Sequence, residues 1–233
     1  MTDTATFKRL EQLLGVSFSD TTYLLSAITH RSFLNENRDA VQEHNERLEF
    51  LGDAVLELVV TDYLFKEFPK KAEGELTAIR AALVNTNTLA ETATTLGINE
   101  YLLLSKGESK DVGRARQYIL ANAFEAIVGA IYLDQGYDAA RDFIASQLFN
   151  KTERIVEKRL WQDAKSRFQE RAQEMVGITP AYQTLKEVGP DHDRMFTVGV
   201  FLGEECVAQG DGRAKQEAEQ KAAENGLAAK GWG

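Results

Sequence analysis

NERLEFLGDAVL, residues 45–56, is the stretch around which the rest of the chain is organised. At about 3.6 residues per turn, its apolar side chains predict one helical stripe, which runs on past the stretch and comprises Leu48, Leu51, Val55, Leu58 and Val59. The acidic side chains recur at steps of three or four on another face, at Glu46, Glu49, Asp53 and Glu57. Because carboxylates one turn apart repel each other, this acidic row favours neutralisation by water, a basic partner or a cation.

Two interpretations of the acidic row stay open. Acids beside an apolar stripe are most often the solvated face of an amphipathic helix, and spacing alone favours that interpretation. ILANAFEAIVGAIYLD, residues 119–134, adds a second observation. It is apolar almost all round, which predicts a buried helix, and Asn122 and Glu125 are its polar exceptions. A buried carboxylate needs a partner or a metal ion.

The two stretches together predict a metal site. If the helices pack against each other, the candidate ligands of one cation are Glu49, Asp53, Asn122 and Glu125. Oxygen ligands suit a hard cation such as Mg²⁺, for which Mn²⁺ can substitute. We expect no small-molecule cofactor beyond this divalent metal.

Composition limits the classes of protein to which the chain can belong. Its 233 residues suffice for one large domain or two ordinary ones. A net charge of −9 excludes nucleic-acid binding through bulk basic charge, so any such binding depends on local patches. The single cysteine, Cys206, excludes an intramolecular disulfide and is typical of a reducing compartment. With no signal-like N-terminus and no apolar run near about 18 residues, we expect a soluble cytoplasmic protein and no membrane partner.

The order of periodic segments predicts two domains. Residues 1–157 have helical periodicity nearly throughout, which predicts an all-α domain, and one continuous helix is expected over residues 70–97. Residues 158–162 are expected to form a linker. Residues 163–231 predict a small α+β domain in the order α-β-β-β-α, with a three-stranded antiparallel sheet. Its helices are expected at 164–176 and 213–229, and its strands at 181–188, 195–202 and 205–209.

Two further side chains of the first domain could take part in chemistry. His30 could be a catalytic base, but it is followed by no obvious Ser or Asp partner, which favours a structural role. Arg80 lies on the outward face of a predicted helix, where it could bind phosphate or be solvated. The pattern favours solvation.

The two acidic stretches and the tail together resemble a bacterial ribonuclease III over almost the whole chain. NERLEFLGDAVL is similar to the signature run of that family, and the match is supported by THRSF at 29–33, by residues 74–85 and by ILANAFEAIVGAIYLD. The tail resembles a double-stranded RNA-binding domain in KSRFQE at 165–170, GPDHDRMFTV at 189–198 and GRAKQEAEQKAA at 212–223.

This resemblance implies an Mg²⁺-dependent endoribonuclease that cuts double-stranded RNA in the processing of ribosomal and other structured RNA. The implied products carry 5′-phosphates, 3′-hydroxyls and short 3′ overhangs. Glu49, Asp53 and Glu125 fall on catalytic positions of the family, with Glu46 beside them in an accessory role. The resemblance also implies a homodimer, in which Phe50 is buried across the interface, although core packing would account for this aromatic residue equally well.

Candidate RNA contacts lie in both domains. They are Arg80 in the first and Gln169, Glu170, Pro190, Asp191, His192, Arg213, Lys215 and Gln216 in the tail. By resemblance the tail reads the shape and 2′-hydroxyls of the minor groove, and the N-terminus of its last helix offers free N–H groups to phosphate. Without the resemblance His192 would be a plain turn residue. Acidic residues outnumber basic ones over 163–233, so we expect weak, salt-sensitive binding by the tail alone.

Asn122 departs from the family pattern, which usually has an acidic metal ligand three residues before Glu125. An amide oxygen can coordinate Mg²⁺, but it is neutral, so affinity for the metal should fall. Three explanations compete: a natural variant that works, an engineered substitution that traps substrate, or a subgroup that binds RNA without efficient cleavage. The intact motifs elsewhere favour the first. The rival hypothesis is a non-cleaving double-stranded RNA-binding protein.

Overall fold

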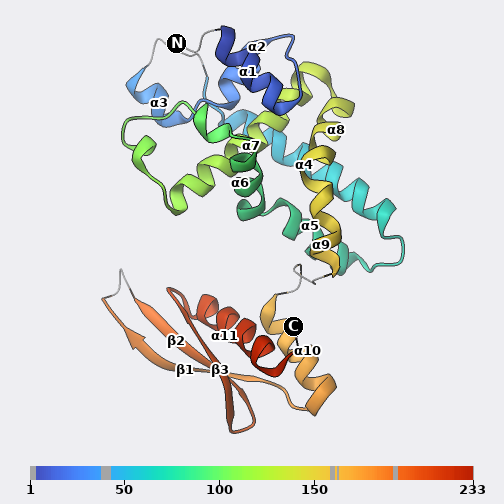
Figure 1. The fold of residues 1–233 in the computed structure, drawn as a ribbon, viewed down its shortest axis with the longest axis vertical. Coiled ribbons are helices and arrows are strands. Elements are labelled where there is room, and N and C mark those ends of the chain that lie inside the picture. The colour runs from blue at the N-terminus through green and yellow to red at the C-terminus, as the bar shows by residue number, and fades with distance from the viewer. Residues whose placement is uncertain (1–3, 38–42, 158–160, 162, 191–193, 233) are drawn as a thin grey trace. The chain divides into compact units, whose positions relative to one another are not determined.

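The computed structural model describes residues 4–37, 43–157, 161, 163–190 and 194–232, and Figure 1 shows its fold. The chain divides into two compact units, Met1–Trp161 and Gln162–Gly233. In its described residues the first unit has helices as its regular elements, apart from one isolated β-bridge between Thr29 and Leu103, and the second combines helices with one sheet. The predicted fold class is therefore confirmed.

The first unit contains nine α-helices within its described residues, joined by loops and short 3₁₀ turns. They are α1 (Thr4–Leu14), α2 (Thr21–Ala27), α3 (Arg31–Glu36), α4 (Glu46–Glu67), α5 (Glu73–Val84), α6 (Thr86–Thr95), α7 (Arg114–Gln135), α8 (Tyr137–Leu148) and α9 (Thr152–Glu157).

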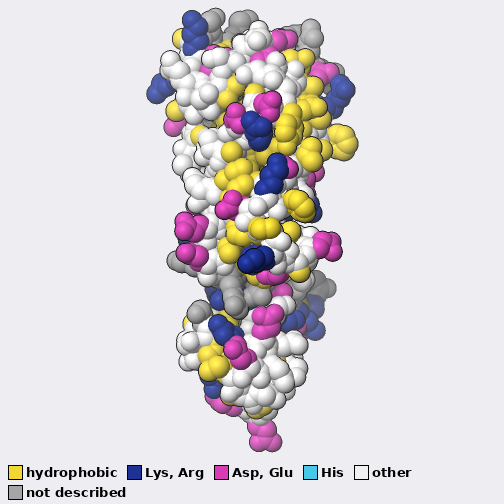
Figure 2. Space-filling model, turned by 90° about the vertical axis from the view of Figure 1, so that its right-hand side faces the viewer, with side chains coloured by type: hydrophobic (Ala, Val, Ile, Leu, Met, Phe, Trp, Pro, Cys, Tyr) yellow, Lys and Arg dark blue, Asp and Glu magenta, His cyan; other side chains and the backbone are white. Residues whose placement is uncertain are grey.

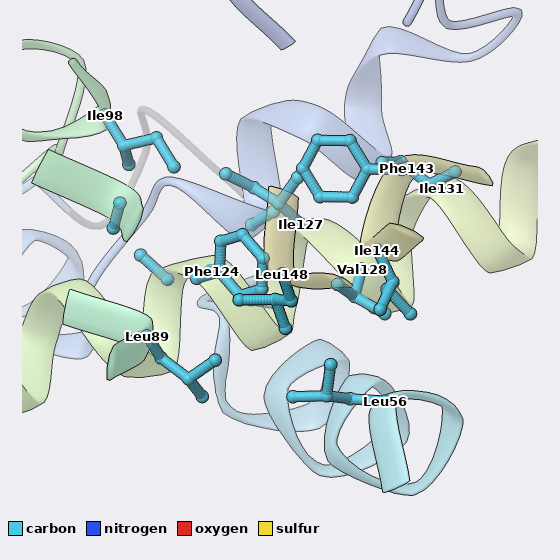
Figure 3. Close-up of a cluster of buried hydrophobic side chains, with 14 of the residues drawn as sticks. Leu56, Leu89, Ile98, Phe124, Ile127, Val128, Ile131, Phe143, Ile144 and Leu148 are labelled. Atoms are coloured by element: carbon cyan, nitrogen blue, oxygen red, sulfur yellow. The ribbon is translucent and has the colours of Figure 1, made fainter. Parts of the chain in front are cut away.

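Helix α7 forms the centre of this unit and packs against α2, α4, α6 and α8 (Figure 1). Its buried face goes most of the way round, as its composition predicted. Figure 3 shows the core beside it, where α7 contributes Phe124, Ile127, Val128 and Ile131, and the surrounding elements contribute Leu56, Leu89, Ile98, Phe143, Ile144 and Leu148. Because α7 is apolar on nearly every side, burial of those side chains stabilises the helix in the centre of the unit.

Helix α4 buries a slightly different stripe from the one that spacing predicted. Leu48, Val55 and Val59 are buried, but Leu58 is 57% exposed, so its assignment to the buried stripe was wrong. The buried face is centred on the side of Gly52 and Leu56, because α7 approaches closest there. Leu58 lies beyond the edge of that face.

The single helix expected over residues 70–97 is also a wrong prediction, because the chain forms two helices there. Asn85 ends α5 and begins α6, with an extended backbone at φ −72° and ψ 159°. Its side-chain oxygen accepts a hydrogen bond from the Thr88 amide at 2.9 Å, which satisfies a free N–H of the new helix. Asn competes with the helical backbone in this way, and continuous apolar periodicity hides the break.

The second unit has the predicted order α-β-β-β-α. Its elements are α10 (Ala164–Val176), β1 (Ala181–Val188), β2 (Met195–Leu202), β3 (Glu205–Gly212) and α11 (Lys215–Lys230). The antiparallel sheet has the order β1-β2-β3, and in its register Val200 lies opposite Tyr182 and Ala208. Phe168, Ala172, Val200 and Leu227 join the two helices to the sheet in one small core.

No helix in the described part of the chain is long and apolar enough to cross a membrane.

Candidate active site and RNA-binding residues

The candidate active site lies where α4 and α7 cross with their backbones in contact. A Cβ added at Gly129 would overlap the Leu48 carbonyl oxygen and lie 3.1 Å from the Gly52 nitrogen. A Cβ added at Gly52 would overlap the Glu125 carbonyl oxygen. Only glycine permits this approach, which brings the acidic face of α4 against the polar positions of α7.

Two arginines form ion pairs with the two end residues of the acidic row of α4. Glu46 pairs with Arg31 of α3 at 3.3 Å. Glu57 pairs with Arg80 of α5 at 2.8 Å, and Arg80 also donates to the Thr61 hydroxyl at 2.9 Å. Glu49 and Asp53, between these ends, have no ion pair within the described residues. The row is therefore neutralised at both ends and left anionic in the middle.

Glu125 of α7 faces this anionic middle. Burial is the main cause that raises its pKa to about 7, and the charges of Asp53 and Glu49 raise it further. Burial likewise raises the pKa of Glu49, with the charges of Glu46 and Asp53 adding to the shift, while a hydrogen bond from the Asn122 side chain opposes it. Glu49 and Glu125 are therefore close enough to Asp53 and to each other for their charges to interact. That Glu49, Asp53, Asn122 and Glu125 bind one metal ion stays a prediction.

The oxygen donors of this group fit a hard divalent cation. The carboxylates of Glu49, Asp53 and Glu125 repel one another, and a bound cation would reduce that repulsion. Within the described ranges, no three acidic, His or Cys side chains lie close enough to hold a metal ion as they stand. Mg²⁺ keeps several waters and needs only one or two direct carboxylates, so this spacing is compatible with it.

Glu46 stands apart from this group, because its carboxylate pairs with Arg31 and faces His44 at 3.9 Å. It acts on the group only by raising the pKa of Glu49. The sequence pattern did not identify Arg31 as its partner, since no local spacing links the two.

His30 has a structural role. Its side chain caps α3 by accepting from the Ser32 amide at 3.3 Å, and its Nδ1 lies 2.8 Å from the Ser32 hydroxyl oxygen. Burial lowers its pKa. These contacts agree with the structural interpretation of His30.

The candidate RNA contacts of the second unit that the structure describes lie on α10, directly after β1, and at or just before the start of α11. Gln169 and Glu170 line a shallow groove along α10 together with Ser166, Gln173 and Glu174. Pro190 is exposed, whereas Asp191 and His192 lie outside the described residues. This groove is polar and open, which suits contacts to hydroxyl groups rather than an apolar ligand.

The start of α11 carries the basic candidates. Arg213, Lys215 and Gln216 are exposed, and the Lys215 ammonium lies 5.8 Å from the centre of the Phe196 ring. The Arg213 amide donates to the Glu217 carboxylate at 2.9 Å, so one N–H at this helix end already has an acceptor. One of the amides near this helix end is therefore already engaged within the chain, and the exposed side chains of Arg213 and Lys215 stay candidate phosphate contacts.

Phe50 points away from the core of its own unit, with 81% of its surface exposed. It borders a concave surface with Tyr23, His44 and Leu133. Leu58 and Phe65 of the same helix are also exposed, and Figure 2 shows a face of the first unit on which hydrophobic side chains gather. Core packing within its own unit therefore does not account for Phe50.

The fold and the acidic crossing define a helical nuclease domain followed by a double-stranded RNA-binding domain. Residues 20–152 match the Ribonuclease-III-like family, and residues 164–229 match the double-stranded RNA binding motif. The chain belongs to the ribonuclease III family, and it is an endoribonuclease.

Relatives and solved structures agree with this assignment. The chain is 46% identical to Ribonuclease 3 of Bdellovibrio bacteriovorus, over 94% of both chains. It is 45% identical to Ribonuclease 3 of Carboxydothermus hydrogenoformans, over 94% of this chain and 93% of the relative. A structure of the nuclease domain of ribonuclease III from Campylobacter jejuni, described as flexible in a region involved in dimer formation, superposes with a TM-score of 0.54. It is 43% identical and covers 60% of this chain and 97% of its own.

Proposed function

We propose that this protein is a Mg²⁺-dependent endoribonuclease that cuts double-stranded RNA into products with 5′-phosphates, 3′-hydroxyls and short 3′ overhangs. Its role would be the processing of ribosomal and other structured RNA in the cytoplasm, with Mn²⁺ able to replace Mg²⁺. The observation that carries the proposal is the anionic middle of the α4 row, which faces Glu125 between two arginine-neutralised ends.

Glu49, Asp53 and Glu125 would hold the metal, with Asn122 beside them and Glu46 in an accessory role. When bound, Mg²⁺ acidifies a water and offsets charge on the phosphate and on the leaving 3′-oxygen. The chain's own contribution is position, because the glycine contact holds both carboxylate-bearing helices in one geometry.

The second unit would contact the duplex and read its shape. Gln169, Glu170 and Pro190, with Asp191 and His192, would contact the minor groove, and Arg213, Lys215 and Gln216 the phosphates. Arg80 is a weaker candidate contact, because Glu57 and Thr61 already engage its guanidinium.

We also propose a homodimer, in which the exposed Phe50 is buried against a second copy of the chain. Two copies would place two cutting sites on one duplex, one for each strand. The dimer formation described for the Campylobacter jejuni nuclease domain supports this proposal.

The test is cleavage of a long perfect RNA duplex by the purified protein with Mg²⁺, Mn²⁺ or EDTA, and Glu125→Gln serves as the matched control. We expect cutting by the unchanged chain only with a divalent metal. Glu125→Gln should abolish cutting and leave RNA binding in Ca²⁺ intact, because it removes a charge from the site and none from the second unit. Cutting in EDTA would contradict the metal requirement.

Asn122→Asp distinguishes the rival hypothesis. If only the Asp form cuts, the chain is a non-cleaving double-stranded RNA-binding protein that lacks a necessary carboxylate. Cutting by both forms supports the proposed nuclease.

A further inference from the structure

The first turn of α10 is joined to α11 by the side chain of Gln220. Its Oε1 accepts a hydrogen bond from the Ala164 amide at 2.9 Å, and its Nε2 donates to Oδ1 of Asp163 at 3.2 Å. Asp163 is also the N-cap of α10, because it accepts from the Ser166 amide at 2.9 Å. One side chain of α11 therefore binds both a free N–H and the capping carboxylate of α10, which lie 56 and 57 positions earlier in the sequence.

An ion pair beside Gln220 makes a second link between the same helices. The Lys165 ammonium lies 2.6 Å from Oε2 of Glu219 and 4.9 Å from the centre of the Tyr182 ring. Both charged side chains are largely buried, with 35% of Lys165 and 27% of Glu219 exposed. The charge of Lys165 is therefore balanced within the unit, by a carboxylate and by the face of an aromatic ring.

Phe168 attaches α10 to α11 at another point, one turn further along the helix. Phe168 is fully buried, and its Cε2 would lie 2.8 Å from a Cβ added at Gly226, so its ring packs on the backbone of α11. The contacts of Gln220 and of Phe168 thus hold α10 at two points along its length. Two fixed points determine the direction of a helix as well as its distance from its neighbour.

The helices joined in this way carry candidate RNA contacts of the second unit. Gln169 and Glu170 line the shallow groove along α10. Lys215 is the first residue of α11, less than two turns before Gln220. The distance between the minor-groove contacts and the phosphate contacts therefore depends on how α10 is attached to α11. A-form RNA presents a wide, shallow minor groove with 2′-hydroxyls, whereas the minor groove of B-form DNA is narrow.

We propose that Gln220, Lys165 and Glu219 are positioning residues, which fix the separation between the RNA contacts of α10 and those of α11 and thereby set the preference of this unit for an RNA duplex over a DNA duplex. This inference rests on the proposed function for the RNA contacts themselves. The three residues act through the helices that carry those contacts. A fixed separation matches one groove geometry, whereas attraction to phosphates alone accepts either duplex.

Gln220→Ala in the full-length protein is the first test, with the exposed Gln183→Ala of β1 as the matched control. Fluorescence anisotropy in Ca²⁺ would compare an RNA duplex with a DNA duplex of the same sequence, at a temperature where circular dichroism shows each variant folded. For Gln220→Ala, affinity for RNA should fall roughly 3- to 10-fold, because two hydrogen bonds that fix the separation are lost. Affinity for DNA should stay within about twofold, since it depends on charge. The control should change neither affinity.

The ratio of the two affinities decides the outcome. Equal falls for RNA and DNA would indicate a general loss of structure and would overturn the proposal. If the unchanged protein prefers RNA and Gln220→Ala keeps the same ratio, this inference is wrong and the proposed function stands. If the unchanged protein itself binds both duplexes equally, the proposed RNA contacts are wrong, and this inference with them.

Lys165→Gln separates a positioning residue from a phosphate contact. It should lower the ratio of RNA to DNA affinity, yet leave the slope of log affinity against log salt concentration unchanged, because Glu219 already balances the charge of Lys165. In a Glu219→Gln background, Lys165→Gln should no longer change the ratio, since the ion pair is already broken. A slope reduced by about one, or an equal effect on the ratio in both backgrounds, would overturn the role of Lys165.

Discussion

Gly52→Ala tests whether the glycine contact between α4 and α7 holds the active site together. The added Cβ would lie 2.6 Å from the Glu125 carbonyl carbon and 2.9 Å from the Gly129 nitrogen, and would overlap the Glu125 carbonyl oxygen. Ordinary contact begins at 3.4 Å, so the helices must separate by on the order of 1 Å. The obstacle is backbone, which cannot rotate out of the way as a side chain can.

The expected cost follows from this separation. Overpacking of a core costs typically about 1–3 kcal/mol, and a backbone obstacle places this variant at about 3 kcal/mol or more. For a chain of this length, that corresponds to a fall in unfolding temperature of roughly 6–12 °C. Cutting should fall on the order of 100-fold even below that temperature, because Glu125 moves relative to Glu49 and Asp53.

Thermal unfolding and cleavage of a duplex RNA measure the two effects, with Gly74→Ala as the matched control. Gly74 lies in α5, and an added Cβ there would meet nothing within 4 Å. The control should keep full cutting and gain up to about 1 kcal/mol from reduced chain entropy. If Gly52→Ala behaves like Gly74→Ala in both assays, close backbone contact is not what positions the site.

The remaining predictions concern charge, assembly and RNA binding. In EDTA, Glu125→Gln should raise the free energy of unfolding at pH 8 by about 1–2 kcal/mol, after allowance for partial exposure, and leave it unchanged at pH 4. The sign follows because the pKa of Glu125 is raised from 4.5 to about 7, so the unchanged protein loses stability as the pH rises through that range. Urea unfolding measures the effect, and an equal gain at both pH values would contradict this prediction. Phe50→Asp should shift sedimentation at low concentration from dimer to monomer, and an unchanged sedimentation coefficient would exclude Phe50 from the interface. Lys215→Gln should weaken duplex binding and reduce its salt dependence by about one counterion. The control Lys221→Gln, in which the replaced lysine pairs with Glu224, should change neither quantity. If both variants give the same slope of log affinity against log salt concentration, Lys215 is not a phosphate contact.

The sequence predicted most of the fold because its elements have local signals. Helix α10 and strands β1 and β2 begin and end where periodicity and turn residues indicated. The acidic composition of the site was also visible, because Glu49 and Asp53 recur on one face and Glu125 interrupts an apolar helix. The break at Asn85 was missed, because a side chain that caps a helix leaves the apolar period intact.

The sequence by itself determined which residues could form an acidic site and which helix would be buried, since both depend on spacing within one helix. Only the tertiary structure decided which carboxylates stay unpaired. Arg31 and Arg80 reach Glu46 and Glu57 from other helices, and Gly52 and Gly129 let the backbones of α4 and α7 touch. Pairing between distant segments depends on how closely backbones approach, which the period of a single helix does not encode.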